Sequence, residues 1–453
     1  MISNCWRFLG AHCRRQGAAR GTWLPRPRYH LRRSRRGAAP GRAAIQHERE
    51  RERHMRTSSR PMAGGPGGGA AICDPDVDPL FRPIEIGRLK LKNRIVMAPM
   101  TRQRASLAGG VTEIMVDYYR QRTSAGLIVS EGLYPCPRGC GYLFSPGLHD
   151  DGQQAGWRDI TDAVHSDGGA IFAQIMHVGR LSDPLILSGA TPLAPSAVQP
   201  DPTARHYTIN SPRPKRPYPR PQAMTHADIL ATVDAFADSA TRARAAGFDG
   251  VEIHAGSGYL PMQFLSSNTN LRADEWGGSV ERRTAFLLAC VDAMAGATYP
   301  GFVAVKISPG WTFHDIFDTD PVATYSHLAR ELSKRGMAYL QIGDYGVGWD
   351  VYATLRPLFD GPIIQVSGYS RRSAAAAIAC EGADMIAFGR AFISNPDLPQ
   401  RLRYGWPTSR ADPATFYTQG SEGYTDYPVH ALSDPAGFEV LDPPADPIGK
   451  RQA

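Results

Sequence analysis

The middle of the chain reads Gly247-Phe-Asp-Gly-Val-Glu-Ile-His254-Ala-Gly-Ser257-Gly-Tyr259-Leu-Pro-Met-Gln263-Phe-Leu265. Residues 251–253 predict a short buried strand. His254, Ser257 and Tyr259 follow at the point where this strand opens into a glycine-rich loop. Hydrogen-bonding side chains on a loop at the C-terminal end of a strand are typical of the active site of a barrel enzyme. The stretch therefore predicts a barrel if the rest of the chain supplies the other strands.

Seven further apolar, β-rich runs alternate with helical patterns. The eight predicted strands cover residues 95–98, 127–130, 171–175, 251–253, 303–307, 339–342, 363–366 and 385–388. Nearly continuous hydrophobicity is typical of parallel strands that are buried on both faces. Helices are predicted over 225–246, 321–334 and 370–380, and a glycine follows each of them as a stop signal. This alternation predicts an α/β protein with a single (β/α)8 TIM barrel.

Charge is distributed unevenly along the chain. Residues 1–61 contain sixteen Arg, three Glu and no Lys, a net charge of +13, whereas the whole chain carries +8. We expect residues 1–73 to form a disordered basic tail, either an incorrectly assigned start upstream of Met62 or an organelle transit segment. Residues 74–428 are expected to form the barrel, and residues 429–453 a loosely ordered tail. No run approaches the ~20 apolar residues of a membrane span.

Two segments depart from the regular alternation. Residues 181–222, between the third and fourth strands, include ten Pro. An insertion of this length inside a compact domain is usually a lid or a binding loop. Residues 412–428 are rich in aromatic side chains, and we expect them to fold back over the mouth of the barrel.

The loops after the seventh and eighth strands have the features of a phosphate site. They contain Ser367-Gly368-Tyr369 and Gly389-Arg390. Glycine lets backbone N–H groups approach an anion closely, and arginine supplies a bidentate cation. The alternative is a pair of ordinary turns with a surface arginine. Because phosphates bind at these two loops in many barrels, the coincidence favours phosphate binding.

Polar side chains also end the earlier strands, among them Thr101, Gln174 and Lys306. Together they fit a flat, hydrogen-bonding heterocycle that carries a phosphate tail, such as an isoalloxazine ring. Each also has a structural alternative. Thr101 could cap a turn, Gln174 could satisfy a neighbour in the barrel, and Lys306 could pair with Glu252.

Longer motifs extend over residues 78–428. They include Asn93-Arg-Ile-Val-Met-Ala-Pro-Met-Thr-Arg102, Ala173-Gln-Ile-Met-His-Val-Gly-Arg180, the stretch quoted first, Asp274-Glu-Trp-Gly-Gly-Ser279, Phe388-Gly-Arg390 and Gly423-Tyr-Thr-Asp-Tyr-Pro428. Through these motifs the chain resembles the Old Yellow Enzyme family of FMN-dependent ene-reductases. The resemblance implies a barrel that binds FMN and uses NADPH or NADH as reductant.

The resemblance also implies which residues contact the cofactor. They are Ala98, Pro99, Met100, Thr101, Gly132, Gln174, Lys306, Gly368, Gly389 and Arg390. Thr101 would bond the C4 carbonyl, Gln174 the pyrimidine edge, and Lys306 would stabilise the anionic reduced ring. Gly368, Gly389 and Arg390 would hold the phosphate. Phe416 and Tyr417 would close the mouth and contact the substrate.

The resemblance further implies the reaction. NAD(P)H would deliver hydride to the flavin, and an α,β-unsaturated carbonyl or nitro compound would then take its place. His254 and Ser257 would bind the carbonyl oxygen, and Tyr259 would protonate Cα. The expected protein is an enzyme of NADPH dehydrogenase type, a cytoplasmic monomer or homodimer. Its partner would be a small enone, with no nucleic acid, membrane or metal.

Four residues depart from the family pattern. Ser257 stands where Asn or His is usual, and Lys306 where Arg is commoner. The shorter hydroxyl of Ser257 predicts weaker phenol binding and an altered substrate preference. Ser367 in the glycine motif and Trp276 in place of a usual Tyr are expected to matter little for the chemistry. Two alternatives stay open: an FMN-binding barrel with altered or lost ene-reductase activity, and a Schiff-base barrel of aldolase type with Lys306 as nucleophile.

Overall fold

The structure is a computed structural model that describes residues 77–201, 217–346 and 348–431. The predicted basic tail, residues 1–73, lies outside the described residues. The predicted C-terminal tail is described only as far as residue 431. There the His430 N–H donates to Asp397 at 2.7 Å, and the His430 ring stacks on Trp406 with centroids 4.2 Å apart. The described chain therefore stays packed slightly beyond the predicted end of the barrel.

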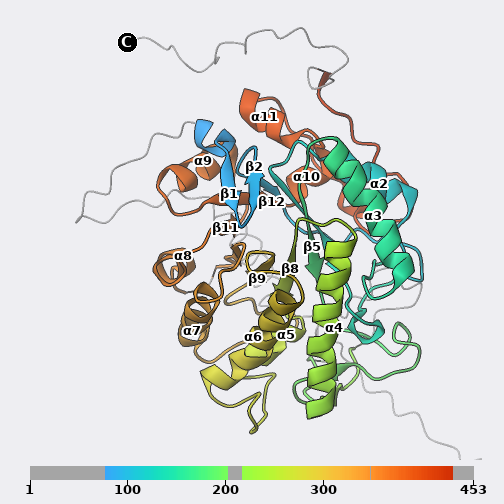
Figure 1. Cartoon of the computed structure of the whole chain (residues 1–453), viewed down its shortest axis with the longest axis vertical. Helices are drawn as coiled ribbons and strands as arrows, with labels where there is room; N and C mark the ends of the chain where they lie inside the picture. The colour runs from blue at the N-terminus through green and yellow to red at the C-terminus, as the bar shows by residue number, and fades with distance from the viewer. Residues whose placement is uncertain (1–76, 202–216, 347, 432–453) are drawn as a thin grey trace, which may run out of the picture. The chain divides into compact units, whose positions relative to one another are not determined.

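Eight parallel strands close into a barrel (Figure 1). They are β3 (Ile95–Met97), β4 (Leu127–Leu133), β5 (Ile171–Ile175), β8 (Gly250–Ala255), β9 (Val303–Ile307), β10 (Leu340–Gly343), β11 (Ile363–Val366) and β12 (Met385–Phe388). β12 pairs with β3, with Phe388 opposite Met97, which closes the ring. The predicted (β/α)8 barrel is confirmed.

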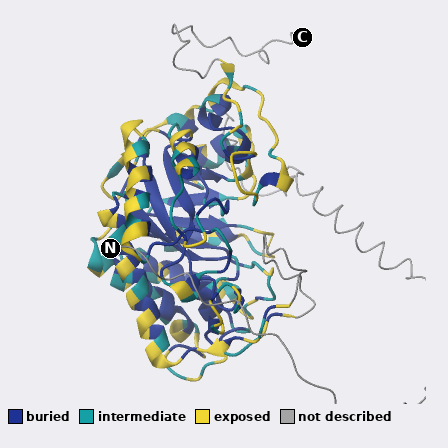
Figure 2. Ribbon diagram, turned by 90° about the vertical axis from the view of Figure 1, so that its right-hand side faces the viewer, coloured by how far each residue is buried: buried dark blue, intermediate teal, exposed yellow. Residues whose placement is uncertain are grey.

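Helices cover the outside of the barrel, with buried residues toward the strands and exposed residues toward solvent (Figure 2). The longer ones are α2 (Glu113–Arg120), α3 (Asp151–Ser166), α4 (His226–Ala245), α6 (Val280–Ala297), α7 (Pro321–Ser333) and α9 (Arg371–Ala379). Shorter ones are α5 (Leu260–Leu265), α8 (Val351–Leu355), α10 (Arg390–Ser394) and α11 (Leu398–Tyr404). The Thr225 hydroxyl and the Asp228 carboxylate form a capping box that starts α4. Among the described helices, none is long and apolar enough to cross a membrane.

Small elements surround the barrel. β1 (Ile84–Ile86) and β2 (Leu89–Leu91) pair in antiparallel fashion before β3. The Pro-rich insertion contributes β6 (Leu193–Ala194), which pairs with β7 (Gln222–Ala223), while residues 202–216 are outside the described part. Leu181 and Tyr218 of this insertion are buried in a cluster with Tyr142, against which Tyr259 packs. The insertion therefore reaches the loop that the first stretch forms.

Candidate active site

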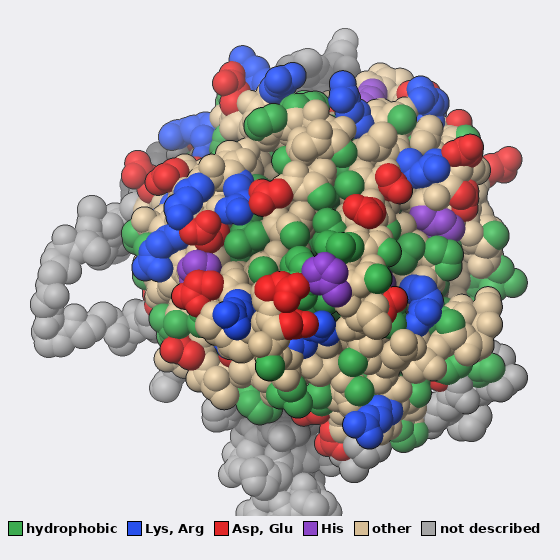
Figure 3. All heavy atoms as spheres, turned by 60° about the horizontal axis from the view of Figure 1, so that its bottom comes forward, with side chains coloured by type: hydrophobic (Ala, Val, Ile, Leu, Met, Phe, Trp, Pro, Cys, Tyr) green, Lys and Arg blue, Asp and Glu red, His purple; other side chains and the backbone are tan. Residues whose placement is uncertain are grey.

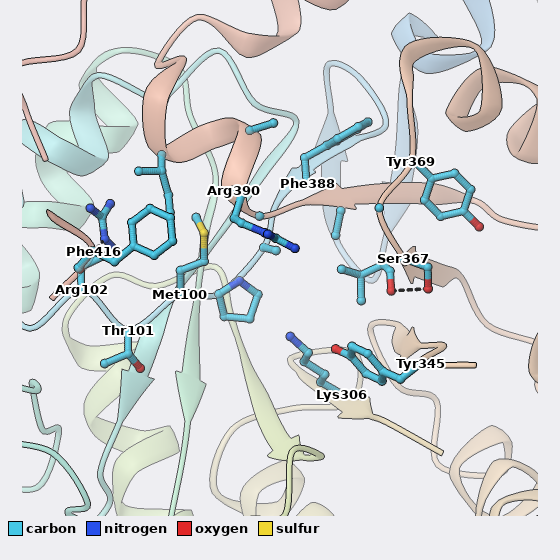
Figure 4. A pocket seen from close by; sticks show the side chains of 18 of the residues that line it. Met100, Thr101, Arg102, Lys306, Tyr345, Ser367, Tyr369, Phe388, Arg390 and Phe416 are labelled. Carbon is cyan, nitrogen blue, oxygen red and sulfur yellow. Dashed lines mark hydrogen bonds between the residues drawn. The ribbon is translucent and has the colours of Figure 1, made fainter. Parts of the chain in front are cut away.

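A cavity of about 650 Å³ opens among the loops at the C-terminal ends of the strands (Figure 4). Ten of the residues predicted to contact cofactor or substrate line it: Ala98, Pro99, Met100, Thr101, Lys306, Gly368, Gly389, Arg390, Phe416 and Tyr417. Gly132 and Gln174 do not line this cavity, and neither do His254, Ser257 and Tyr259. The structure therefore brings most of the predicted cofactor residues together at one mouth.

The loops after β11 and β12 leave open space for an anion. Gly368 has φ 68°, and a Cβ built there would meet no atom within 4 Å. A Cβ at Gly389 would come no closer than 3.7 Å to its nearest neighbour, the sulfur of Met100. The side chains of Arg390 and Lys306 face the same space (Figure 4). Two positive groups and two glycine turns suit a phosphate-bearing ligand.

Polar side chains are also buried inside the barrel, on the strands around Lys306. Gln174 on β5 donates from Nε2 to Oε1 of Glu252 on β8 at 2.7 Å. Lys306 on β9 pairs in register with His254. Burial lowers the pKa of Lys306, and the charge of Glu252 partly opposes this shift. Gln341, opposite Lys306 in the register, is fully buried, and within the described residues both of its amide atoms lack a hydrogen-bond partner. Orphaned polar groups beside a cavity fit a hydrogen-bonding ring such as flavin.

His254 and Tyr259 lie together at the end of β8. Their rings meet edge to face, with centroids 4.9 Å apart. Nδ1 of His254 accepts the N–H of Gly256 at 3.3 Å, which leaves Nε2–H as the donor of a neutral ring. Burial, with help from the charge of Lys306, lowers the pKa of His254 well below its ordinary value. His254 is therefore a neutral hydrogen-bond donor at physiological pH.

Tyr142 was not predicted from the sequence. Its hydroxyl lies 2.8 Å from the hydroxyl of Tyr259. Burial raises the pKa of Tyr259 to about 12, and that of Tyr142 well above its usual range. Both phenols are therefore protonated at neutral pH. The two residues are 117 positions apart, so no local sequence pattern indicates the contact.

Two buried arginines were also missed. The guanidinium of Arg102 donates to the carbonyl oxygens of Phe416 and Gly423, at 3.1 and 2.7 Å. That of Arg104 donates to the carbonyl oxygens of Thr415 and Phe416, at 3.0 and 2.9 Å. These bonds hold the segment 413–424 against the cavity, as the prediction that residues 412–428 cover the mouth requires. Arg102 directly follows residues 98–101 of the motif, but Phe416 and Gly423 are more than three hundred positions away.

Ser257 occupies the tip of the loop. Its backbone has φ 55°, and its N–H donates to the Ser308 hydroxyl at 2.8 Å. Its carbonyl oxygen accepts from Nδ1 of His314 at 3.3 Å. Main-chain contacts therefore fix the position of the loop.

A closed parallel barrel with two glycine turns, an arginine and aromatic side chains around the cavity at its mouth is the arrangement expected of a flavin-binding barrel enzyme. The family model described as the NADH:flavin oxidoreductase / NADH oxidase family matches residues 79–409. The chain belongs to this family, which includes Old Yellow Enzyme. Its cofactor is FMN, and NAD(P)H is the reductant.

Similar proteins cover most of this chain. A chanoclavine-I aldehyde reductase of Penicillium roqueforti is 39% identical over 369 residues, which is 78% of this chain and 96% of that protein. A 12-oxophytodienoate reductase of Oryza sativa subsp. japonica is 36% identical, over 77% and 94%. The structure of morphinone reductase in complex with tetrahydroNAD has a TM-score of 0.75 and 39% identity, over 80% and 99%. The protein is accordingly an FMN-dependent oxidoreductase that reduces activated C=C bonds.

Proposed function

We propose that His254 and Tyr259 carry out the chemistry of an ene-reductase, and that Ser257 completes the site that binds the substrate oxygen. The observation that supports this proposal is the cluster of His254, Tyr259 and Tyr142 beside Lys306 and the cavity. The proposed substrate is a small α,β-unsaturated carbonyl or nitro compound. FMN, when bound, would supply the hydride chemistry that links NAD(P)H to the alkene.

The neutral His254 ring donates from Nε2 to the carbonyl oxygen of the substrate. This bond draws electron density from the alkene and strengthens as negative charge develops on the oxygen. Burial keeps the site in a low-dielectric environment, in which such a bond has a larger effect. The Ser257 hydroxyl is the proposed second donor, shorter than the Asn or His of relatives.

Tyr259 donates its phenolic proton to Cα. Because burial raises its pKa to about 12, it carries that proton throughout the neutral range. The hydroxyl of Tyr142, at 2.8 Å, holds the phenol in place and stabilises the tyrosinate that remains after proton transfer.

In the proposed arrangement Gly368, Gly389 and Arg390 would hold the phosphate of FMN. Lys306 and Gln174 would bind the pyrimidine edge, and Gly132 and residues 98–101 would line the ring. Phe416 and Tyr417 close the mouth. A Schiff base on Lys306 is the less favoured alternative, because FMN chemistry already uses a cation at this position.

We propose that NADPH is an effective reductant and that the enzyme is a cytoplasmic monomer or homodimer without a nucleic-acid partner. On the face seen in Figure 3, acidic and basic side chains are interspersed. Nucleic-acid binding would instead favour a basic stripe on the surface.

An anaerobic absorbance experiment tests the proposal. Purified protein is expected to be yellow, to lose its flavin absorbance on addition of NADPH, and to regain it on addition of 2-cyclohexenone. The bleaching rates with NADPH and NADH give the coenzyme preference. A reduced enzyme that the enone does not reoxidise would contradict the proposed activity, and borohydride trapping of a carbonyl compound on Lys306 would support the aldolase-type alternative.

A further inference from the structure

Glu252 is a fully buried carboxylate to which the proposed chemistry gives no role. It lies on β8 two residues before His254, so both side chains face the barrel interior. Its Oε1 accepts the amide N–H of Gln174 on the neighbouring strand at 2.7 Å. Burial of a charged group is costly unless the group is paired or hydrogen-bonded.

A positive charge lies close to this carboxylate. Burial raises the pKa of Glu252, and the charge of Lys306, a side chain that is 7% exposed, opposes this shift. Oε1 of Glu252 is the acceptor in its contact with Gln174, and a carboxylate oxygen that accepts selects one orientation of the Gln174 amide. That orientation points one N–H at Glu252 and leaves the second N–H and the carbonyl oxygen for a ligand.

A flavin pyrimidine edge offers an N–H donor next to carbonyl acceptors. An amide with a free carbonyl oxygen and a free N–H matches this pattern, whereas a flipped amide would set donor against donor. Gln174 can satisfy the edge only when its orientation is fixed. Groups in an outer layer commonly orient the residues that contact a cofactor.

We propose that Glu252 is a positioning residue for FMN, because it fixes the amide of Gln174 in the orientation that the pyrimidine edge requires. This inference rests on the proposed contact between Gln174 and FMN. It predicts that the two side chains act as one unit in cofactor binding.

To test the inference, holoenzyme is diluted and the release of FMN is monitored through the recovery of flavin fluorescence. Glu252→Met and Gln174→Met are each expected to raise the FMN dissociation constant about tenfold, and the double variant no more than about threefold beyond Gln174→Met. Glu252→Gln can still present an acceptor to the amide but no longer forces its orientation, so its loss of affinity is expected to be smaller than that of Glu252→Met. Circular dichroism of each holoenzyme checks the fold.

Gln153→Met is the matched control. Gln153 is also a buried, hydrogen-bonded glutamine, but it lies on α3, away from the cavity residues. Its replacement is expected to lower thermal stability and leave FMN affinity unchanged.

The remaining outcomes distinguish the role of Glu252 from the contact between Gln174 and FMN. Wild-type FMN affinity in Glu252→Met, multiplicative losses in the double variant, or an equal loss in Glu252→Gln would overturn the positioning role alone. Wild-type affinity in Gln174→Met would overturn the proposed Gln174 contact, and with it the inference.

Discussion

Ser257 has a backbone conformation that suits other residues better. Its φ of 55° is in the left-handed region, which Asn and Gly adopt more readily than Ser. The loop is fixed through the main chain by Ser308 and His314. The side chain at this position can therefore be exchanged while the loop keeps its shape.

Ser257→Asn is expected to strengthen substrate binding. The amide donor extends further than a hydroxyl, and the loss of such a donor costs about 2.7–4 kcal/mol in transition-state stabilisation as an upper bound. The phenol dissociation constant is expected to be about tenfold lower, which corresponds to about 1.4 kcal/mol of binding free energy. Turnover of cyclic enones is expected to be faster. Spectral titration with phenol measures the binding.

Ser257→Ala is the control, since it removes the hydroxyl without adding a donor. Because the proposed second donor is lost, its phenol affinity is expected to fall by about threefold or more relative to wild type. If the Ser257→Asn variant binds phenol no more tightly than wild type, a water molecule or another residue already supplies the second donor.

The segment that follows α11 depends on buried arginines. Tyr118 and Tyr424 stack with centroids 4.0 Å apart, and Arg104 lies over the Tyr424 ring at 4.7 Å. The Arg104 guanidinium also donates to the main chain of the segment at Thr415 and Phe416. Removal of this side chain would leave several carbonyl oxygens without their donor.

Arg104→Met is expected to loosen this segment. Each unsatisfied buried group costs about 1–3 kcal/mol, so we expect the free energy of local opening of the segment to fall by about 2–3 kcal/mol. Limited proteolysis of native holoenzyme should then cleave within residues 413–428 at least about tenfold faster.

Arg372→Met, an exposed arginine on α9, is the control and should leave this cleavage unchanged. Equal cleavage rates in wild type and Arg104→Met would show that other contacts hold the segment.

The elements were predictable because their signals are local. Apolar runs identify the eight strands, and Thr225 with Asp228 identifies the start of α4. The contacts of Tyr142 with Tyr259, and of Arg102 and Arg104 with residues near 416–423, join distant positions. No periodicity or motif records such contacts, since they depend on how finished elements pack. Ser257 was visible only as a departure from a family pattern, and its positive φ required coordinates.

On the scale of the whole molecule, the family match covers residues 79–409 and so begins after the basic segment of residues 1–61. A chain that starts at Met62 is therefore expected to bind FMN and reduce 2-cyclohexenone at the same rate as the full chain. Comparison of the two proteins by absorbance and enone turnover checks this. A truncated protein that loses FMN would show that the segment contributes to the barrel.

The central claim is that Tyr259 protonates the substrate. Its most direct test is the rate at which enzyme reduced by NADPH is reoxidised by 2-cyclohexenone, compared between wild type and Tyr259→Phe. We expect the variant to be slower by about 10²–10⁴ in this step and to be reduced by NADPH at an unchanged rate. Burial raises the pKa of Tyr259 to about 12, above its unfolded value, so its proton is retained at lower pH and lost only as the pH rises through that value. The ratio of the two rates should therefore stay constant from about pH 6 to about pH 10. Equal reoxidation rates, or a ratio that falls tenfold within this range, would contradict the assignment.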